Sequence, residues 1–298
     1  MRESDKLLAT TISVSYPGKG EVLRHASLEM RRGEILGLAG SSGSGKSTLT
    51  LAIMNLLDGK KAKCLGSIYF NGRDLLSLRE REMRHVRGRE IALVLQSPAS
   101  ALNPMLRLGR QMQEAWRAHS QGKDAKTAIA KALEAVSLPS EASFLKRYPS
   151  QISTGQGQRV LIAMAILHSP ELIVADEPTS ALDSITQQEI LSLFQRLNRA
   201  LGMAILLVSH DLLAMASICD RIAILHSGQI LECGETEQIL YRPVHPYTQQ
   251  LTAAFRAHAT SRRDSDKFPT DNEQQCLVSA AAAGAGHSSY GPPAENDD

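Results

Sequence analysis

The sequence reads Gly40-Ser41-Ser42-Gly43-Ser44-Gly45-Lys46-Ser47 between a short apolar run and a helical pattern, and this stretch decides the fold. It fits G-x-x-x-x-G-K-[ST], with a predicted buried strand over 34–39 before it and a predicted helix over 46–57 after it. Glycines let backbone N–H groups surround phosphate oxygens without a Cβ in the way. The helix that follows adds the positive end of its dipole. The stretch therefore predicts a loop that binds nucleotide phosphates.

The last two residues of this loop, Lys46 and Ser47, provide a positive charge and a metal-binding hydroxyl. Lys46 is expected to reach the β- and γ-phosphates of ATP, and the Ser47 hydroxyl is expected to ligate Mg²⁺. A flexible serine-glycine loop is the alternative, but such a loop would not require Lys-Ser at the start of a helix. The residues expected to contact the nucleotide are Gly40, Ser41, Ser42, Gly43, Ser44, Gly45, Lys46, Ser47 and Thr48.

Short apolar runs alternate with longer helical stretches over most of the chain, which favours an α/β fold with a largely parallel sheet. A mainly helical and polar stretch over about 108–146 is typical of an insertion. The predicted strands span residues 34–39, 66–70, 91–95, 172–175, 204–208, 222–225 and 229–233.

Two carboxylates, Asp176 and Glu177, follow the predicted strand 172–175. Open α/β sheets bind ligands at the carboxyl ends of their strands, and adjacent strand residues point to opposite faces. We therefore expect Asp176 to orient the Mg²⁺ shell and Glu177 to polarise the attacking water. Taken alone, an Asp-Glu pair after a strand is more simply a charge pair at a helix N-terminus, but the phosphate loop upstream favours the catalytic interpretation.

Two further polar residues, Gln96 and His210, follow the predicted strands 91–95 and 204–208. A lone histidine after a strand is more often a surface or capping residue. Beside a γ-phosphate, His210 would donate a hydrogen bond to the transferring group, and Gln96 would contact Mg²⁺ or water. The convergence of these residues on one phosphate loop supports a catalytic site more strongly than any of them alone.

A second helix N-terminus suited to an anion begins at Ser153-Thr154-Gly155-Gln156-Gly157-Gln158-Arg159. Ser153 is the expected N-cap, and Gly155 allows close backbone approach. The helix spans about 13 residues, or roughly 20 Å at 1.5 Å per residue, before the next strand. Its N-terminus is therefore expected far from the chain's own phosphate loop, which predicts a site completed across a dimer. An ordinary capped helix is the alternative.

The composition restricts the class of protein. The 298 residues carry 33 Lys+Arg against 31 Asp+Glu, a balance that argues against a dedicated nucleic-acid binder. The basic stretch Arg79 to Arg89 is interspersed with glutamates, as is typical of a solvated helix. No run approaches the ~18–20 apolar residues of a membrane span, and the N-terminus lacks the apolar core of a secretory signal peptide. The 4 cysteines show no metal-ligand or disulfide spacing.

The composition changes near Ala259. Residues 260–298 hold 3 Lys+Arg against 7 Asp+Glu and few large apolar side chains. Such a segment cannot bury enough surface to offset the entropy of ordering. We predict a globular domain over 1–256 and a disordered tail over 257–298, with a short partner-binding helix around 277–283 as the alternative.

Together these motifs resemble those of an ABC transporter ATP-binding subunit, and the resemblance covers about Leu7 to Ala254. It implies a P-loop NTPase fold with a mostly parallel core sheet, an antiparallel β-subdomain and a helical subdomain over about 97–168. The resemblance also implies that Tyr16 stacks on adenine and that Asp183 belongs to the D-loop. The signature residues that would complete a partner's ATP site are Ser153, Thr154, Gly155 and Gln156.

Three stretches resemble the oligopeptide/dipeptide/nickel uptake branch of this family: Asp74 to Arg84, Leu95-Gln96-Ser97-Pro98 and Pro243-Val244-His245-Pro246-Tyr247-Thr248. The branch implies two ATPase subunits that sandwich ATP and drive transmembrane permease subunits, fed by an extracytoplasmic solute-binding protein. The chain would then lie peripherally on the cytoplasmic face of the inner membrane and power import of oligo- or dipeptides. The alternatives are import of nickel or another small solute, an ABC ATPase acting on nucleic acid or ribosomes, and a non-transport module of a phosphonate-cleaving complex.

The signature departs from the family pattern at Thr154, which stands where the family has a glycine. A Cβ and a hydroxyl there would crowd the backbone at the partner's γ-phosphate. We therefore expect the ATP site formed by this signature to be weak, which favours a paralogous partner over an identical one. Some members of the branch carry a cysteine cluster for an iron–sulfur centre, which is not expected here because only Cys276 follows the His-Pro-Tyr motif.

Overall fold

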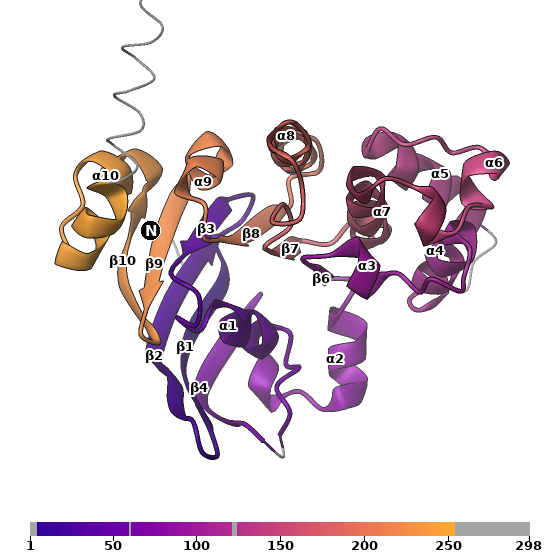
Figure 1. Ribbon diagram of the computed structural model, residues 1–298. Helices are drawn as coiled ribbons and strands as arrows, with labels where there is room; N and C mark the ends of the chain where they lie inside the picture. The colour runs from indigo at the N-terminus through magenta and orange to yellow at the C-terminus, as the bar shows by residue number, and fades with distance from the viewer. Residues whose placement is uncertain (1–4, 60, 121–123, 254–298) are drawn as a thin grey trace, which may run out of the picture. The chain divides into compact units, whose positions relative to one another are not determined.

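The computed structural model describes residues 5–59, 61–120 and 124–253 (Figure 1). The chain divides into a compact unit from Met1 to Thr252 and a second unit from Ala253 to Asp298, so the described residues belong to the first unit apart from Ala253. The predicted boundary at residue 256, the predicted tail with its alternative helix, and Cys276 lie outside the described residues.

A six-stranded sheet with the order β10-β9-β3-β8-β7-β6 forms the core. Its parallel strands are β3 (Ile35–Ala39), β6 (Ile91–Val94), β7 (Leu172–Asp176), β8 (Ala204–Ser209) and β9 (Arg221–His226), and β10 (Gln229–Glu235) pairs with β9 in the antiparallel sense. β3 and β8 are buried along their whole length, as expected for strands covered on both faces. The mostly parallel core sheet is therefore confirmed.

A smaller antiparallel sheet has the order β2-β1-β4-β5. Its strands are β1 (Lys6–Tyr16), β2 (Gly20–Arg31), β4 (Lys63–Phe70) and β5 (Arg73–Asp74). Burial alternates along β1, which is the pattern of a sheet with one covered face. This sheet is the predicted antiparallel β-subdomain, and its long β1 and β2 were not identified from periodicity.

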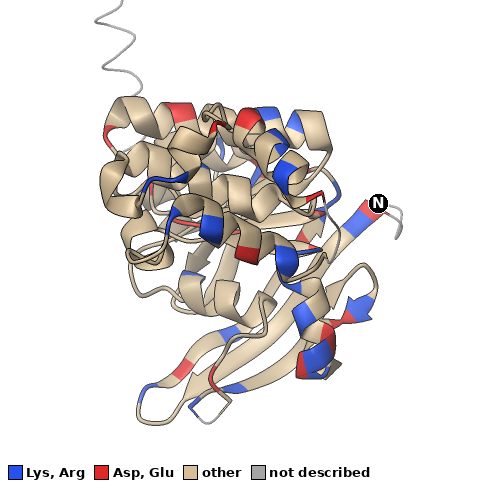
Figure 2. Ribbon diagram, turned by 90° about the vertical axis from the view of Figure 1, so that its right-hand side faces the viewer, with Lys and Arg blue, Asp and Glu red and all other residues tan. Residues whose placement is uncertain are grey.

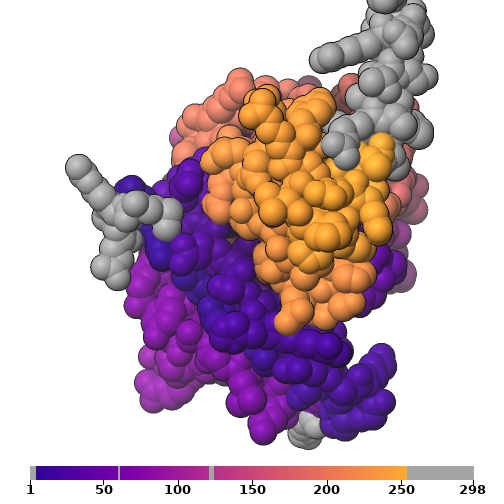
Figure 3. Space-filling view, turned by 90° about the vertical axis from the view of Figure 1, so that its left-hand side faces the viewer, coloured from indigo at the N-terminus to yellow at the C-terminus, as the bar shows by residue number. Residues whose placement is uncertain are grey.

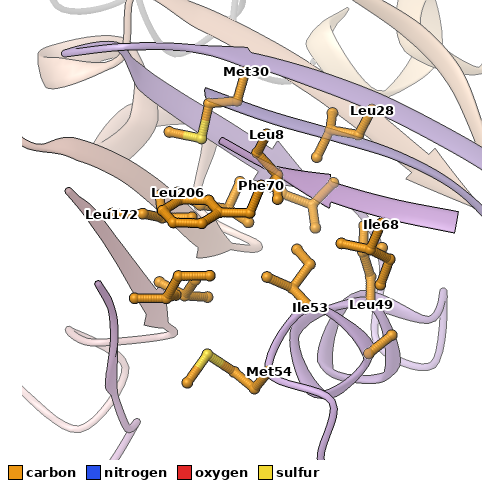
Figure 4. Close-up of a cluster of buried hydrophobic side chains, with 14 of the residues drawn as sticks. Leu8, Leu28, Met30, Leu49, Ile53, Met54, Ile68, Phe70, Leu172 and Leu206 are labelled. Atoms are coloured by element: carbon orange, nitrogen blue, oxygen red, sulfur yellow. The ribbon is translucent and has the colours of Figure 1, made fainter. Parts of the chain in front are cut away.

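The helix α1 (Lys46–Ile53) packs its apolar side chains into a core shared by the two sheets. Leu49 and Ile53 belong to the same buried cluster as Phe70 of the smaller sheet and Leu206 of the core sheet (Figure 4). This core anchors the helix that follows the phosphate loop. The helix ends at Ile53 and not at residue 57, because Asn55 turns into the left-handed region at φ 47°.

Between β6 and β7 the chain forms a group of helices that lie together at one side of the core sheet (Figure 1). The group consists of α3 (Pro98–Ala101), α4 (Leu108–Arg117), α5 (Ala125–Ala135), α6 (Ala142–Leu145), a short 3₁₀ turn at Pro149–Gln151 and α7 (Thr154–Ile166). The apolar residues of α5 that recur at helical spacing are buried, including Ile129 and Leu133. The predicted helical insertion is thus present, and it begins before residue 108.

The remaining helices lie between strands, except α10, which follows the last strand, β10. They are the 3₁₀ turn Leu75–Ser77, α2 (Glu80–Val86), α8 (Ser184–Leu201), α9 (Leu212–Ile218) and α10 (Thr236–Tyr241). Charges of both signs are interspersed on the face shown in Figure 2, and around α2 they pair, as in the bonds of Arg87 and Arg84 to Glu80. Within the described residues, no helix combines the length and the apolar character that a membrane span requires.

Elements from the two ends of the described chain lie side by side on the face shown in Figure 3. The backbone N–H of Arg24 in β2 donates to the carbonyl oxygen of Gly228, in the turn between β9 and β10, at 2.8 Å. The same turn reaches the phosphate loop, because the N–H of Gly228 donates to the carbonyl oxygen of Ser44 at 3.1 Å. The turn between β9 and β10 therefore holds the phosphate loop in place through this hydrogen bond.

Candidate active site

The phosphate loop joins β3 to α1, and its glycines permit a path that other residues would block. Gly45 adopts a φ of 110°, a conformation that residues with a side chain rarely take. A Cβ on Gly40 would collide with the carbonyl oxygen of Leu225 in β9. Lys46 Nζ donates to the carbonyl oxygens of Gly40 at 2.8 Å and Ser41 at 3.1 Å. The ammonium group is therefore held inside the loop.

A cavity of about 770 Å³ borders this loop, within the usual range for small-molecule sites. Tyr16, at the end of β1, lines it together with Glu177, which follows β7. Lysines outnumber carboxylates in the lining, which suits an anionic ligand. The other lining residues are Pro17, Lys19, Val22, Ser42, Gly43, Gly45, Lys46, Ser47, Thr48 and Lys61.

Glu177 stands between two polar side chains that come from the ends of neighbouring strands. Gln96 Nε2 lies 3.4 Å from Glu177 Oε2, and His210 Nδ1 lies 3.4 Å from Glu177 Oε1. Gln96 also donates to Ser180 Oγ at 2.9 Å. The Glu177 backbone adopts a φ of 48°, and its N–H donates to the carbonyl oxygen of Val208 at 2.9 Å. A strained backbone at a carboxylate beside a cavity is typical of functional sites.

Asp176, the last residue of β7, offers an oxygen atom suited to a cation. Its Oδ1 is buried and has no hydrogen-bond partner among the described residues. Burial raises the pKa of Asp176 and the Glu177 carboxylate raises it further, while the Ser47 hydroxyl and the Lys46 ammonium oppose the shift. A buried carboxylate oxygen next to a serine hydroxyl matches the oxygen ligands that Mg²⁺ prefers. These residues therefore fit the metal that the sequence predicts.

The second predicted anion site stands at the start of α7, apart from the cavity. Ser153 caps the helix: its Oγ accepts from the N–H of Gln156 at 3.2 Å, and Gln156 Oε1 accepts from the N–H of Ser153 at 3.2 Å. Thr154 is the exposed first residue of the helix. Of the described residues, none that lines the cavity belongs to α7, and Figure 1 shows α1 and α7 apart. The sequence predicted that these residues lie away from the chain's own phosphate loop, and the structure places them away from it.

Asp183 forms the cap of α8. Its Oδ1 accepts from the N–H groups of Ile185 at 3.1 Å and Thr186 at 3.0 Å, and its Oδ2 accepts from the Thr186 hydroxyl at 2.7 Å. These bonds hold the pKa of Asp183 below its usual value, and the bond from the backbone N–H of Thr186 has the largest effect. Asp183 is exposed at the surface. The Asp183 carboxylate is thus a negative charge that is held in place at the N-terminus of α8.

Comparison with known proteins decides the family. The family model described as ABC transporter matches residues 23–180, more than half of the chain. The chain is an ABC transporter ATP-binding subunit. The match covers the phosphate loop, Gln96, the start of α7 and the carboxylates at the end of β7, so the resemblance inferred from the motifs is confirmed.

Curated proteins that are similar to this ABC subunit include two that it matches over most of their length. The probable D,D-dipeptide transport ATP-binding protein DdpD of Escherichia coli (strain K12) is 40% identical over 259 residues, which is 85% of this chain and 79% of that protein. The dipeptide transport ATP-binding protein DppD of Bacillus subtilis (strain 168) is 39% identical over 240 residues, which is 80% of this chain and 72% of that protein.

A solved structure shows the same fold. The ATP-binding cassette MJ0796, determined as a dimer in a post-hydrolysis state bound to ADP and Pi, has a TM-score of 0.67 and 28% identity, covering 77% of this chain and 98% of that chain. The ABC subunit is accordingly an ATPase that binds ATP, with the P-loop fold that the sequence predicted.

Some residues of the ABC subunit's site were not singled out from the sequence. Lys19 and Lys61 line the cavity from the turn after β1 and the loop before β4. Ser180, which accepts from Gln96, lies in the stretch Ser180 to Asp183 that resembles the D-loop, but no role of its own was expected for it. The Pro-Gly-Lys-Gly turn directly after Tyr16 could have indicated Lys19. Lys61 has no such local signal, because its position depends on how the loop folds back.

Proposed function

We propose that this ATPase powers the import of oligo- or dipeptides through a membrane permease. The observation that carries its ATP-hydrolysing part is the position of Glu177, which lines the nucleotide cavity while Gln96 and His210 face its two carboxylate oxygens. A carboxylate fixed in this way beside a phosphate loop is suited to activating a water molecule for phosphoryl transfer.

The proposed reaction assigns one task to each side chain. Lys46 neutralises charge on the β- and γ-phosphates, and Glu177 orients the attacking water and accepts its proton. His210 holds the Glu177 carboxylate and donates a hydrogen bond to the transferring phosphoryl group. Gln96 fixes the opposite carboxylate oxygen and contacts the water or the metal. Tyr16 provides an aromatic face for the adenine ring.

Ser47, Asp176 and Gln96 would hold Mg²⁺ in this proposal. The unpartnered Oδ1 of Asp176 and the Ser47 hydroxyl next to it support the assignment. The ion would neutralise charge shared by the β- and γ-phosphates.

A second ABC ATPase subunit would complete the site. Ser153, Thr154, Gly155 and Gln156 stand at the N-terminus of α7, whose orphan N–H groups suit a phosphate. Since no residue of α7 is among the described residues that line the chain's own cavity, these groups would serve the ATP bound by the partner. Thr154 favours a paralogous partner over an identical one.

The peptide substrate rests on the relatives, which are named for transport of D,D-dipeptides and dipeptides. We infer that transmembrane permease subunits bind this chain at the cytoplasmic face of the inner membrane, where it lies peripherally. An extracytoplasmic solute-binding protein would deliver the peptide and contact the chain only indirectly. Nucleic acid is not expected as a partner, because acidic and basic residues are interspersed on α2.

The test is ATP hydrolysis by the chain purified with its permease subunits, its ATPase partner and its binding protein, and reconstituted in liposomes. Peptide-loaded binding protein should stimulate hydrolysis several-fold, and the complex carrying Glu177→Gln should not respond. Stimulation by Ni²⁺ but not by peptides would replace peptide import by nickel import. Copurification with enzymes of phosphonate cleavage, and no permease, would refute the transport function.

A further inference from the structure

The start of α7 and the start of α8 touch within one subunit. A Cβ added to Gly155 would lie 2.7 Å from Thr186 Cγ2, closer than carbon atoms pack, so the Gly155 backbone is in direct contact with the Thr186 methyl group. One turn further along, Arg159 pairs with Glu189 at 2.8 Å. The Arg159 side chain is mostly buried, at 15% exposure, which makes this pair more than a loose surface contact. The two helices are thus fastened to each other over their first turns.

The Thr186 side chain also holds the carboxylate of Asp183. Its hydroxyl donates to Asp183 Oδ2 at 2.7 Å, and its backbone N–H donates to Asp183 Oδ1 at 3.0 Å. Threonine is branched at Cβ, so a single torsion angle sets the hydroxyl and the methyl group together. A rotation that withdraws the methyl group from Gly155 therefore also breaks the hydroxyl's bond to Asp183.

We propose that Thr186 is a positioning residue that makes the signature at the start of α7 and the D-loop at Asp183 act as one rigid unit on the ATP bound by the partner subunit. The inference rests on the proposed function, because the signature would meet a second ATP site only in a dimer. A displacement of Gly155 moves the methyl group, and the shared torsion angle carries the displacement to Asp183. The signature and Asp183 are then either both correctly placed for the partner's site or both displaced from it.

A purely local role for Thr186, as a residue of the first turn of α8, predicts something different. The backbone N–H of Thr186 reaches Asp183 whatever its side chain is, so the helix cap survives most substitutions. A local role would therefore change the stability of α8 at most. The proposed role changes the rate of hydrolysis while folding and ATP affinity stay the same.

A near-isosteric substitution isolates the hydroxyl contact of Thr186. Thr186→Val keeps the branched shape and the methyl group but removes the hydroxyl that binds Asp183. In the reconstituted complex described above, kcat should fall about tenfold, the scale of a small misplacement of a catalytic group. The KM for ATP should stay within about twofold, and the thermal midpoint should not change. Thr127→Val, at an exposed position of α5, is the matched control and should match the unaltered complex.

The methyl contact is tested with a pair of variants. Gly155→Ala places a methyl group against Thr186 Cγ2 and should lower kcat about tenfold or more, since a displaced signature costs catalysis. Thr186→Ser removes Cγ2 but keeps the hydroxyl, so the double variant Gly155→Ala/Thr186→Ser should recover several-fold of the lost activity. This recovery can be measured even if Thr186→Val impairs folding.

The inference is overturned by an unaltered kcat in a folded Thr186→Val complex, or by no recovery in the double variant. It is also overturned if kcat of Thr186→Val falls together with its thermal midpoint, because loss of folded protein would then explain the lower rate. These outcomes are distinct from failure of the proposed function, in which the unaltered complex itself does not hydrolyse ATP in response to peptide.

Discussion

His210 Nδ1 lies 3.4 Å from Oε1 of Glu177, so the imidazole and the carboxylate form one unit at the edge of the nucleotide cavity. Because Glu177 is the side chain that would accept a proton from water, replacing it by glutamine removes the base and keeps the shape. We expect Glu177→Gln to lower kcat at least about 100-fold. ATP affinity should change less than about threefold, since the loop around Lys46 is intact.

Steady-state hydrolysis and titration with a fluorescent ATP analogue measure these two quantities. Glu134→Gln, at an exposed position of α5, is a matched control that should change neither. Substantial remaining turnover in Glu177→Gln would refute the assignment of Glu177 as the base.

The buried Oδ1 of Asp176 leads to a prediction about the metal. Asp176→Asn replaces a negative ligand by a neutral one, so the Mg²⁺ concentration for half-maximal hydrolysis should rise at least about tenfold. Chelation with EDTA should abolish hydrolysis in both proteins, and added Mg²⁺ should restore it. Asp124→Asn, at an exposed residue before α5, serves as the control. An unchanged Mg²⁺ dependence in Asp176→Asn would contradict the assignment.

The candidate site was largely predictable because its residues sit at strand ends. The carboxyl ends of parallel strands meet at one edge of a sheet, so Gln96, Glu177 and His210 were expected together from their positions alone. The contact between Gly155 and Thr186 was not predictable in this way. It depends on how two helices pack, and no periodicity or spacing encodes which residues of two helices meet.

The fold was predictable to a different extent in its two sheets. The core strands are short continuous apolar runs bounded by turns, and these runs identified them in the sequence. The long β1 and β2 were not identified from the sequence pattern, and only the family resemblance implied their sheet. The register between these two strands shifts at several points, which the sequence pattern does not encode. The end of α1 was placed too late because Asn55 is compatible with a helix in sequence and takes a left-handed φ through its context.

Thr154 leads to a prediction about the ATP site that this signature would form with a partner subunit. It is exposed at the first position of α7, where a Cβ and a hydroxyl would crowd a phosphate that approaches the helix N-terminus. We expect Thr154→Gly to raise the rate of ATP hydrolysis by the reconstituted complex several-fold. The measurement is kcat with saturating peptide-loaded binding protein, and Thr127→Gly on α5 is the control for adding a glycine to a helix. An unchanged kcat would contradict the prediction.

Glu232 in β10 leads to a prediction about stability and pH, because it binds the segment that follows α10. Its carboxylate accepts from the N–H groups of Val244 at 2.9 Å and His245 at 3.0 Å. Partial burial alone would raise the pKa of Glu232, but these bonds and the nearby His245 outweigh it and hold the pKa below the usual 4.5. The ionised form therefore stabilises the fold fully above the usual value, and this stabilisation is lost as the pH falls through the lowered value.

Glu232→Gln should accordingly lower the free energy of unfolding by about 1 kcal/mol at neutral pH, the scale of a charge-assisted hydrogen bond at a partly exposed site. The difference from the unaltered protein should shrink as the pH is lowered below the usual pKa of a glutamate, because the unaltered carboxylate then becomes neutral as well. Urea titrations at a series of pH values measure both quantities, with Glu134→Gln as the control. A difference that stays the same across this pH range would show that the Glu232 charge does not hold the segment, since a neutral hydrogen bond would not titrate.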